Sequence, residues 1–460
     1  MIATDTERAF ETKKVNRLVW DYALPAIVGM VVNSLYNIVD RVFLGHGVGT
    51  IAMSGLVIAF PVMILMSSLG LLVGSGASSR ISLALGQKNR ERAELILGNA
   101  FLLIIVFNIL ITAVFLVFLE PVLTAFGANE HTLPYARDYL QIIIPGNIFV
   151  SMCFCFNNMM RVSGYPKKAM YTIFIGAGCN VILTPVFIFG LGMGIRGAAI
   201  STVISMFIGM MFVMRHFVQS DSLIRLKKKN IRFHWAIIAA IVSIGLSPFL
   251  MQVAATLVAV LMNTQLMRFG GEVAVGAFGI YISMAMLIVM VVIGLNQGMQ
   301  PIIGYNYGAQ NYDRVKQTFY YGLKVATVIT SVGFLTGMFL PQMLASAFTT
   351  DPYLLEMAVR NIRIATLAFP FIGFQIVVAN YFQSIGQAQK SIILSLSRQI
   401  LFLIPALWIL PRFWGLDGVW AAGPVSDVAS AVVSVCFLVH LTRGLNRLME
   451  GERNPTSNYE

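Results

Sequence analysis

Twelve long apolar runs constrain this 460-residue chain more than any other feature of its sequence. Each run holds about 20 or more residues, the length that an α-helix needs to cross the hydrocarbon core of a bilayer. Charged residues make up only 11% of the chain, against about a quarter in soluble globular proteins. No run alternates with period two, which disfavours a β-barrel. The runs lie at 18–43, 51–78, 95–119, 134–160, 169–190, 194–217, 235–262, 274–300, 317–340, 357–383, 391–411 and 417–441.

The basic residues predict the orientation of these spans. The chain holds 32 Lys and Arg and has a net charge of +12. With both termini in the cytoplasm, most of these cations fall inside, as the positive-inside rule requires. This distribution accounts for the charge better than nucleic-acid binding does, and a full-length first span argues against a cleaved signal peptide. The outside would receive only Arg41, Arg137, Arg196, Arg268, Arg360, Arg363 and Arg412.

The two halves of the chain resemble each other at a shift of about 222 residues. "LGQKNRER" (85–92) aligns with "YGAQNYDR" (307–314), and further pairs follow in order. Each copy holds six spans, so both enter the membrane in the same orientation, as in many secondary transporters. We therefore expect an all-α integral membrane protein of twelve transmembrane helices in two pseudo-symmetric six-helix lobes. The further pairs are Asn158 with Asn380, Gly164 with Gly386, Lys168 with Lys390, Gly194 with Gly415 and Gly197 with Gly418.

This repeat predicts the organisation of the chain. The linker between the lobes, 219–234, is polar and basic, and we expect it to be a topogenic loop without a binding role. The full division is a cytoplasmic N-terminal segment (1–17), an N-lobe (18–218), the cytoplasmic linker (219–234), a C-lobe (235–441) and a cytoplasmic C-terminal tail (442–460).

A polar stripe runs along the first span. Asn33, Tyr36, Asn37 and Asp40 stand at i, i+3, i+4 and i+7, which is one face of a helix. The same span carries Pro25, which removes a backbone hydrogen bond and predicts a bending point. Two interpretations of the acid stay open: an interfacial residue at the outer end of a long span, or a functional intramembrane carboxylate. The stripe beneath it favours function.

Other spans offer polar groups that could line one cavity with this stripe. The fifth span carries Asn180 and Thr184 one turn apart, and the sixth carries Thr202 and Ser205 after small residues that permit close helix packing. In the fourth span Asn157 and Asn158 are adjacent, so only one of them faces a given cavity. The C-terminal half carries Arg398 and Asp427, for which an ion pair is the natural structural interpretation. Their estimated depths differ by about 10 Å at about 1.5 Å per residue, which leaves direct pairing open.

No enzyme signature accompanies these groups. The sequence shows no Gly-rich phosphate loop, no GxSxG elbow and no pair of histidines at metal-binding spacing. We therefore expect no catalytic activity, no cofactor and no resident metal. An ATP-driven pump is disfavoured, because the chain has no nucleotide site of its own.

Four stretches closely resemble the multidrug and toxic compound extrusion (MATE) family. They are "YNIVDRVFLG" (36–45), "RVSGYPKKAM" (161–170), "GMGIRGAAIST" (192–202) and "GLNQGMQPIIGYNYGAQNYDRV" (294–315). The resemblance covers essentially the whole chain and is greater to the DinF-type bacterial branch than to the NorM type. It implies twelve helices in two lobes, and a protein that exports small amphipathic, often cationic, drug-like compounds. We expect this protein to lie in a bacterial inner membrane as a monomer surrounded by lipid.

The resemblance also implies roles for individual residues. Asp40 matches the first-helix acid whose protonation is tied to bending of that helix at Pro25. Tyr36, Asn180 and Thr202 match positions that line the same N-lobe cavity, as does an asparagine of the fourth helix, for which we choose Asn157. Asn33, Asn37 and Thr184 complete the predicted set, and no residue is assigned to catalysis or to a metal.

Two departures from the family pattern favour protons over sodium ions as the coupling ion. Many DinF-type relatives have an acid where this chain has Thr184, so Asp40 would carry the N-lobe charge alone. The acids that NorM-type members place in the seventh and tenth helices have no counterpart here. The alternatives are a sodium-coupled antiporter, a flippase for a lipid-linked precursor and, from an unrelated class, a membrane enzyme or receptor. The polar residues of the seventh and tenth spans are Gln252, Asn263, Gln265, Gln375 and Asn380.

Overall fold

Helices form every element in the part of the chain that the structure describes. The computed structural model describes residues 5–48, 50–220 and 222–453, apart from the side chains of 5–7, 37, 41, 50–53, 440 and 442–453. Their contacts divide the chain into two compact units. We name them the N-unit, Val28–Gln252, and the C-unit, which combines Met1–Ile27 with Val253–Glu460.

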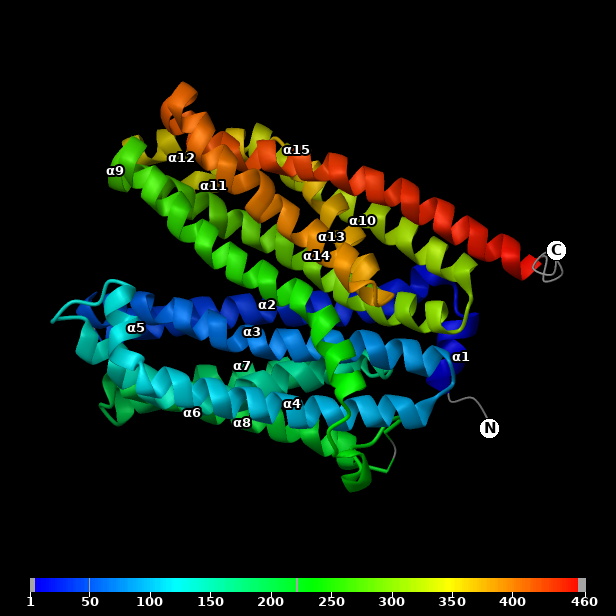
Figure 1. Ribbon diagram of the computed structural model, residues 1–460. Coiled ribbons are helices and arrows are strands. Elements are labelled where there is room, and N and C mark those ends of the chain that lie inside the picture. Colours follow the sequence, from blue (N-terminus) through cyan, green and yellow to red (C-terminus); the bar gives the residue numbers. More distant parts are fainter. Residues whose placement is uncertain (1–4, 49, 221, 454–460) are drawn as a thin grey trace. The chain divides into compact units, whose positions relative to one another are not determined.

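The N-unit is a bundle of long helices. Within it α3 packs on α4 and α6, and α8 packs on α6 and α7, so these helices run side by side in Figure 1. Its elements are the second part of α2 (Val15–Val48), α3 (Thr50–Gly86), α4 (Arg90–Val117), α5 (Leu119–Ala125), α6 (Leu133–Val162), α7 (Pro166–Pro185), the π-helix η1 (Val186–Gly190), α8 (Gly194–Val218), η2 (Lys228–Asn230) and the start of α9 (Trp235–Gly308).

The C-unit is built in a similar way. Its α10 packs on α13, which also contacts α14 and α15. The elements are α1 (Asp5–Thr12), the start of α2, the remainder of α9, α10 (Tyr312–Phe339), α11 (Pro341–Ser346), α12 (Pro352–Ala365), α13 (Phe369–Ser384), α14 (Ala388–Leu396), the π-helix η3 (Ser397–Leu403) and α15 (Ile404–Arg453).

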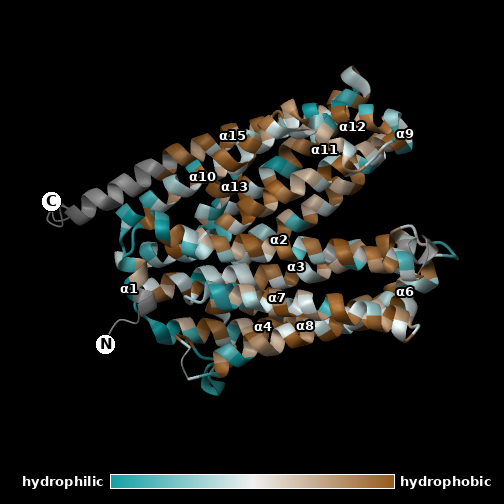
Figure 2. Ribbon diagram, turned by 180° about the vertical axis from the view of Figure 1, so that it is seen from behind, coloured by the Kyte–Doolittle hydropathy of each residue, from teal (hydrophilic) through white to brown (hydrophobic). Residues whose placement is uncertain are grey.

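The described helices account for twelve membrane crossings. Nine stretches are long and apolar enough to span a bilayer, and α12 with α13 forms a tenth, bent by 52°. Two of these stretches hold two arms each, because the backbone leaves helical geometry at Gly271 in α9 and at Gly415 in α15. Figure 2 shows hydrophobic residues along the middle of the long helices and hydrophilic ones near their ends. The predicted all-α, twelve-helix fold is confirmed.

The repeat inferred from the sequence has a structural counterpart in the turns. Asn89 caps α4 by accepting from the Arg92 amide, and Asn311 caps α10 by accepting from the Arg314 amide. The residue before each cap, Lys88 or Gln310, has a positive φ, of 58° and 61° respectively. Positive φ recurs in the matched glycine pairs Gly164 with Gly386 and Gly194 with Gly415. These matched positions therefore adopt the same local geometry in both copies.

Two helices belong to both units. The boundaries found from contacts, Ile27/Val28 and Gln252/Val253, fall inside α2 and α9, whereas the sequence division was drawn at the linker. In the N-unit the start of α9 crosses α3 at glycines: a β-carbon on Gly245 would lie 1.8 Å from the Leu72 carbonyl oxygen, and one on Gly76 would lie 2.0 Å from that of Ile241. In the C-unit the corresponding contact is made by α9 beyond its break, where a β-carbon on Gly298 would lie 2.5 Å from the backbone of Ala23. The start of α2 therefore packs in the C-unit, although the rest of α2 belongs to the N-unit. The start of α9 packs in the N-unit, although the rest of α9 belongs to the C-unit.

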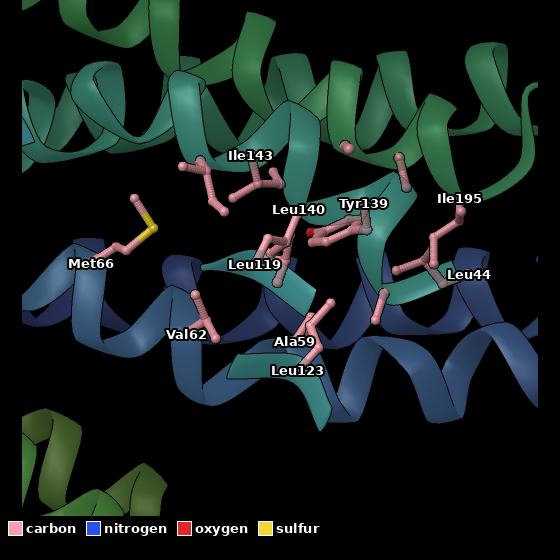
Figure 3. Packing of buried hydrophobic residues seen from close by; sticks show 14 of the residues in the cluster. Leu44, Ala59, Val62, Met66, Leu119, Leu123, Tyr139, Leu140, Ile143 and Ile195 are labelled. Carbon is pink, nitrogen blue, oxygen red and sulfur yellow. The ribbon is translucent and has the colours of Figure 1, made fainter. Parts of the chain in front are cut away.

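A packed cluster in the N-unit fixes the helices around the first-span acid. Leu44 of α2, Met66 of α3 and Leu140 of α6 are all buried in it. In Figure 3 Leu140 lies beside Leu119, and Leu44 lies beside Ile195, each pair coming from different helices. Between membrane-spanning helices such side chains stabilise the bundle through van der Waals packing, because the surrounding lipid is as apolar as they are. The cluster thus holds the polar groups described below on a rigid frame.

Candidate functional site

Asp40 of α2 lies in a hydrogen-bonded cluster inside the N-unit. The Thr184 hydroxyl, on α7, donates to Asp40 Oδ1 at 3.2 Å. The same hydroxyl lies 3.3 Å from Asn180 Oδ1 and 2.8 Å from Ser201 Oγ. Asn180, Thr184 and Ser201 are fully buried. Asp40 therefore accepts from a fully buried hydroxyl of α7, which in turn contacts Ser201 of α8.

The cluster continues onto α8. The Asn180 amide donates to the Thr202 hydroxyl at 3.3 Å, and Thr202 in turn donates to the Ala198 carbonyl at 3.0 Å. Ser201 donates to the same carbonyl at 2.9 Å. Pro185 ends α7 directly after Thr184, and the next turn is the π-helix η1. Proline and π-turns both disturb the regular backbone ladder and recur at functional sites.

Two tyrosines border this cluster. Tyr36 of α2 is close enough to Asp40 to interact with it electrostatically. Tyr139 of α6 interacts with both Asp40 and Tyr36, and its hydroxyl contacts Thr202. Figure 3 shows the ring of Tyr139 among the apolar side chains of the hydrophobic cluster that contains Leu44, Met66 and Leu140. Tyr139 and Ser201 were missed from the sequence, because a phenol or a serine hydroxyl in an apolar span carries no signal of the direction in which it points.

The structure brings together Tyr36, Asp40, Asn180, Thr184 and Thr202 from the predicted set. Asn33 is half-buried on α2, two turns before Asp40, while the side chain of Asn37 lies outside the described residues. Pro25 is buried inside α2.

Asn157 is placed elsewhere. It lies 18 residues after Tyr139 on α6, about 27 Å along the helix at about 1.5 Å per residue. Its amide donates to the Ala169 carbonyl at 2.7 Å, and its oxygen accepts from Arg161 at 2.9 Å. Arg161 also donates to Asn158 Oδ1 at 3.1 Å. Both asparagines therefore solvate a buried guanidinium at the far end of α6.

The C-unit resolves the question of Arg398 and Asp427. Arg398 Nε donates to Asp427 Oδ1, so the two form a direct ion pair. A depth difference of about 10 Å applies only to regular helices, whereas Arg398 lies in the π-helix η3 and α15 breaks at Gly415. Among the described residues, no group of three or more His, Cys, Asp or Glu side chains converges as a metal site would require.

Substitution of Thr184 by valine tests the cluster. Valine keeps the shape but removes the donor to Asp40 and a partner of Asn180 and Ser201, so we expect a loss of about 1–3 kcal/mol in stability. The measurement is thermal unfolding of the purified protein in detergent. Thr264→Val is the control, because Thr264 is exposed and donates only to Val260 in its own helix. Equal melting temperatures for both variants would contradict the hydrogen-bonded cluster.

Comparison with known proteins identifies the family. The sequence profile of the family described as MatE matches residues 25–186 and 244–409, well over half of the chain. The chain belongs to the MatE family. The multidrug export protein MepA of Staphylococcus haemolyticus is 25% identical over 439 residues, which cover 95% of this chain and 96% of MepA. The FAD transporter of Shewanella oneidensis is 26% identical over 427 residues, which cover 91% and 93%.

Solved structures agree with this assignment. The MATE multidrug transporter DinF-BH is 38% identical and has a TM-score of 0.87, with 92% of this chain and 95% of that chain covered. A MATE protein in complex with MaL6 has a TM-score of 0.90 over 97% of this chain and 100% of that chain. At 24% identity, the second match shows the fold alone. This MATE protein is therefore a multi-span membrane transporter, as the sequence resemblance predicted.

Proposed function

We propose that this MATE transporter exports amphipathic, often cationic, drugs from the bacterial cytoplasm by antiport with protons, and that Asp40 is the coupling carboxylate. The observation that carries the proposal is the bond from Thr184 to Asp40 inside the buried N-unit cluster. MepA and DinF-BH, which this chain resembles, are described as multidrug proteins. Both termini lie in the cytoplasm in this proposal, as the positive-inside distribution predicts.

The hydroxyl of Thr184 can switch between acceptors. A hydroxyl carries one proton, so Thr184 donates to Asp40, Asn180 or Ser201, but to only one of them at a time. Ionised Asp40 favours the first arrangement, because hydrogen bonds to a charged acceptor are stronger. When Asp40 takes up a proton, it ceases to compete, and Thr184 can turn to Asn180. Protonation at Asp40 thereby changes the hydrogen bonds between α2, α7 and α8.

Competition for one carboxylate couples the two fluxes. A proton and a cationic drug both neutralise Asp40, so each lowers the affinity for the other, and this linkage is reciprocal. Proton entry on the outside releases the drug, and drug binding on the inside releases the proton. A charge moving through about 100 mV contributes about 2.3 kcal/mol, to which the proton gradient adds. This driving force suffices for concentrative export.

The decisive experiment is transport of ethidium in liposomes under an imposed proton gradient. Asp40→Asn keeps the shape of the side chain but cannot carry a proton, so we expect proton-driven transport to fall to the level of protein-free liposomes. Asp21→Asn is the matched control, because Asp21 lies on the same helix and forms an exposed ion pair with Lys13 at 2.9 Å. Its transport should equal that of the wild type.

A parallel arm imposes a sodium gradient without a proton gradient. Wild-type transport in that arm alone would replace the proton by sodium in the proposal. Proton-driven transport that survives in folded Asp40→Asn would move the coupling site away from α2. A flippase for a lipid-linked precursor would instead show no ethidium flux in either arm, since its site would hold phosphates through cations.

A further inference from the structure

The C-unit contains a charged pair in which the acid is buried and the base is partly open. The side chain of Asp427 is 3% exposed, whereas that of Arg398 is 28% exposed. Arg398 lies on η3 and Asp427 on the second arm of α15. Gln375 of α13 donates to the Asp427 carbonyl, and Tyr281 of α9 interacts electrostatically with both charges. Four helix segments therefore surround the acid, while the side chain of Arg398 remains partly exposed.

The accessible part of Arg398 cannot face lipid. Its span begins at Ala388 and continues to the break at Gly415, so Arg398 lies about 15 Å from the nearer end at about 1.5 Å per residue. That distance is too long for the side chain to reach the headgroups. Charged groups at such depth face the protein interior or water, because exposure to hydrocarbon costs about 2.5 kcal/mol or more. The exposed part of the Arg398 side chain is therefore available to a solute.

The pair leaves hydrogen-bonding capacity on that exposed part. A guanidinium has five N–H donors in a planar fork that matches a carboxylate. Within the part of the chain that the structure describes, Arg398 makes one hydrogen bond, in which Nε donates to Asp427. The Nη groups can therefore donate to a second anion while Nε stays bonded to Asp427. If Asp427 moves away, Nε can donate to that anion as well.

The pair occupies the helices that correspond to the N-unit cluster. In the repeat, η3 with its neighbours matches the helix of Asn180 and Thr184, and the second arm of α15 matches α8. Asp427 falls within one residue of the counterpart of Ser205, which donates to the Ser201 carbonyl. In the first copy, hydroxyl groups and the Asn180 amide lie beside the acid Asp40. In the second copy, the cation Arg398 is paired with the buried acid Asp427. The two copies therefore suit solute groups of opposite charge.

We propose that Arg398 binds the carboxylate of amphipathic substrates and that Asp427 is a built-in competitor for the same guanidinium. This inference rests on the proposed drug-export function and extends its substrates from cations to zwitterions and acids. When no acidic substrate is present, Asp427 neutralises Arg398, which keeps an unpaired charge out of the bundle. A substrate carboxylate takes over that role, so acidic groups are accepted at this site without leaving Arg398 unpaired.

The test uses two dyes that differ at one group. Rhodamine 110 carries a free carboxylate, and rhodamine 123 is its methyl ester. Their affinities for the purified protein in detergent are measured by fluorescence polarisation. Arg398→Gln should weaken rhodamine 110 about tenfold or more, the effect of one charged hydrogen bond, and leave rhodamine 123 within about twofold. Asp427→Asn should strengthen rhodamine 110 binding, because it removes the competitor.

Two further variants and three possible outcomes complete the test. Arg360→Gln is the control, since Arg360 pairs with Asp417 on the exposed surface of the same unit, and neither dye should respond to it. The double variant Arg398→Gln/Asp427→Asn keeps the shape of the pair without charge, so it should fold and bind both dyes equally. A ratio of the two affinities that stays constant across folded variants would show a purely structural pair and overturn the proposal. Binding of the ester but not the acid by the wild type would also overturn it while leaving drug export intact, whereas binding of neither dye would overturn both proposals.

Discussion

Gly245→Ala is expected to leave little folded protein. A β-carbon at this position would lie 1.8 Å from the carbonyl oxygen of Leu72 and 2.6 Å from its carbonyl carbon. Both are backbone atoms of α3, so no side chain can rotate away, and the two helices must separate. Overpacking of this kind costs about 1–3 kcal/mol where side chains can adjust, and we expect about 3 kcal/mol or more here. The measurement is the yield of monodisperse protein and its melting temperature.

The same helix supplies the control for this prediction. Gly279 is also in α9, and nothing lies within 4 Å of a β-carbon placed there. Gly279→Ala should be neutral or raise stability by up to about 1 kcal/mol, since alanine is the better helix former. Gly76→Ala should resemble Gly245→Ala, because it meets the Ile241 carbonyl from the other side of the same crossing. Equal stability of the Gly245 and Gly279 variants would show that α9 and α3 do not cross as closely as described.

Arg398→Leu is expected to cost about 3–5 kcal/mol of stability. The substitution leaves the buried carboxylate of Asp427 without the guanidinium that neutralises it, and an orphaned buried charge is more costly than the pair it came from. Gln375 offers no compensation, because its amide is engaged with the backbone carbonyl of Asp427. Thermal unfolding of purified variants in detergent measures the loss.

The double variant Arg398→Leu/Asp427→Leu separates charge from packing. Replacing both members of a buried pair by apolar residues is often neutral or stabilising by about 1–4 kcal/mol, so the double variant should recover the melting temperature lost in the single one. The double variant should also bind rhodamine 110 more weakly than the wild type does. A double variant as unstable as the single one would mean that η3 depends on the shape of the pair rather than on its charges.

Much of the candidate site could be predicted from local pattern. The stripe on the first span placed Tyr36 and Asp40 on one face, and spacing on the fifth span paired Asn180 with Thr184; in the structure all four lie in or beside one cluster. Periodicity within a helix is a local property, so it survives without knowledge of the neighbours. The family resemblance implied that Asn180 and Thr202 line one N-lobe cavity, and in the structure the Asn180 amide donates to the Thr202 hydroxyl.

What could not be predicted depends on how each helix is turned against its neighbours. Tyr139 and Ser201 reach the cluster because of the rotation of α6 and α8, which no pattern within those spans reveals. Asn157 was chosen over Asn158 for the cavity, yet both accompany the buried Arg161. From the sequence, Arg161 is predicted to be a cytoplasmic cation like its neighbours. Its burial beside Asn157 and Asn158 depends on tertiary packing, which the local pattern does not reveal.

The mixed membership of α2 and α9 has a consequence for biosynthesis. All residues of the N-unit lie between 28 and 252, so this unit can close while the ribosome is still making the second half. Residues 1–27 emerge first, but they belong to a unit whose other members begin at 253. The earliest segment must therefore wait in the membrane for partners that are synthesised last. If the gene were divided at the linker, the start of α2 would be made on the polypeptide that lacks the rest of the C-unit, and the start of α9 on the polypeptide that lacks the rest of the N-unit. Neither half would then encode a complete unit.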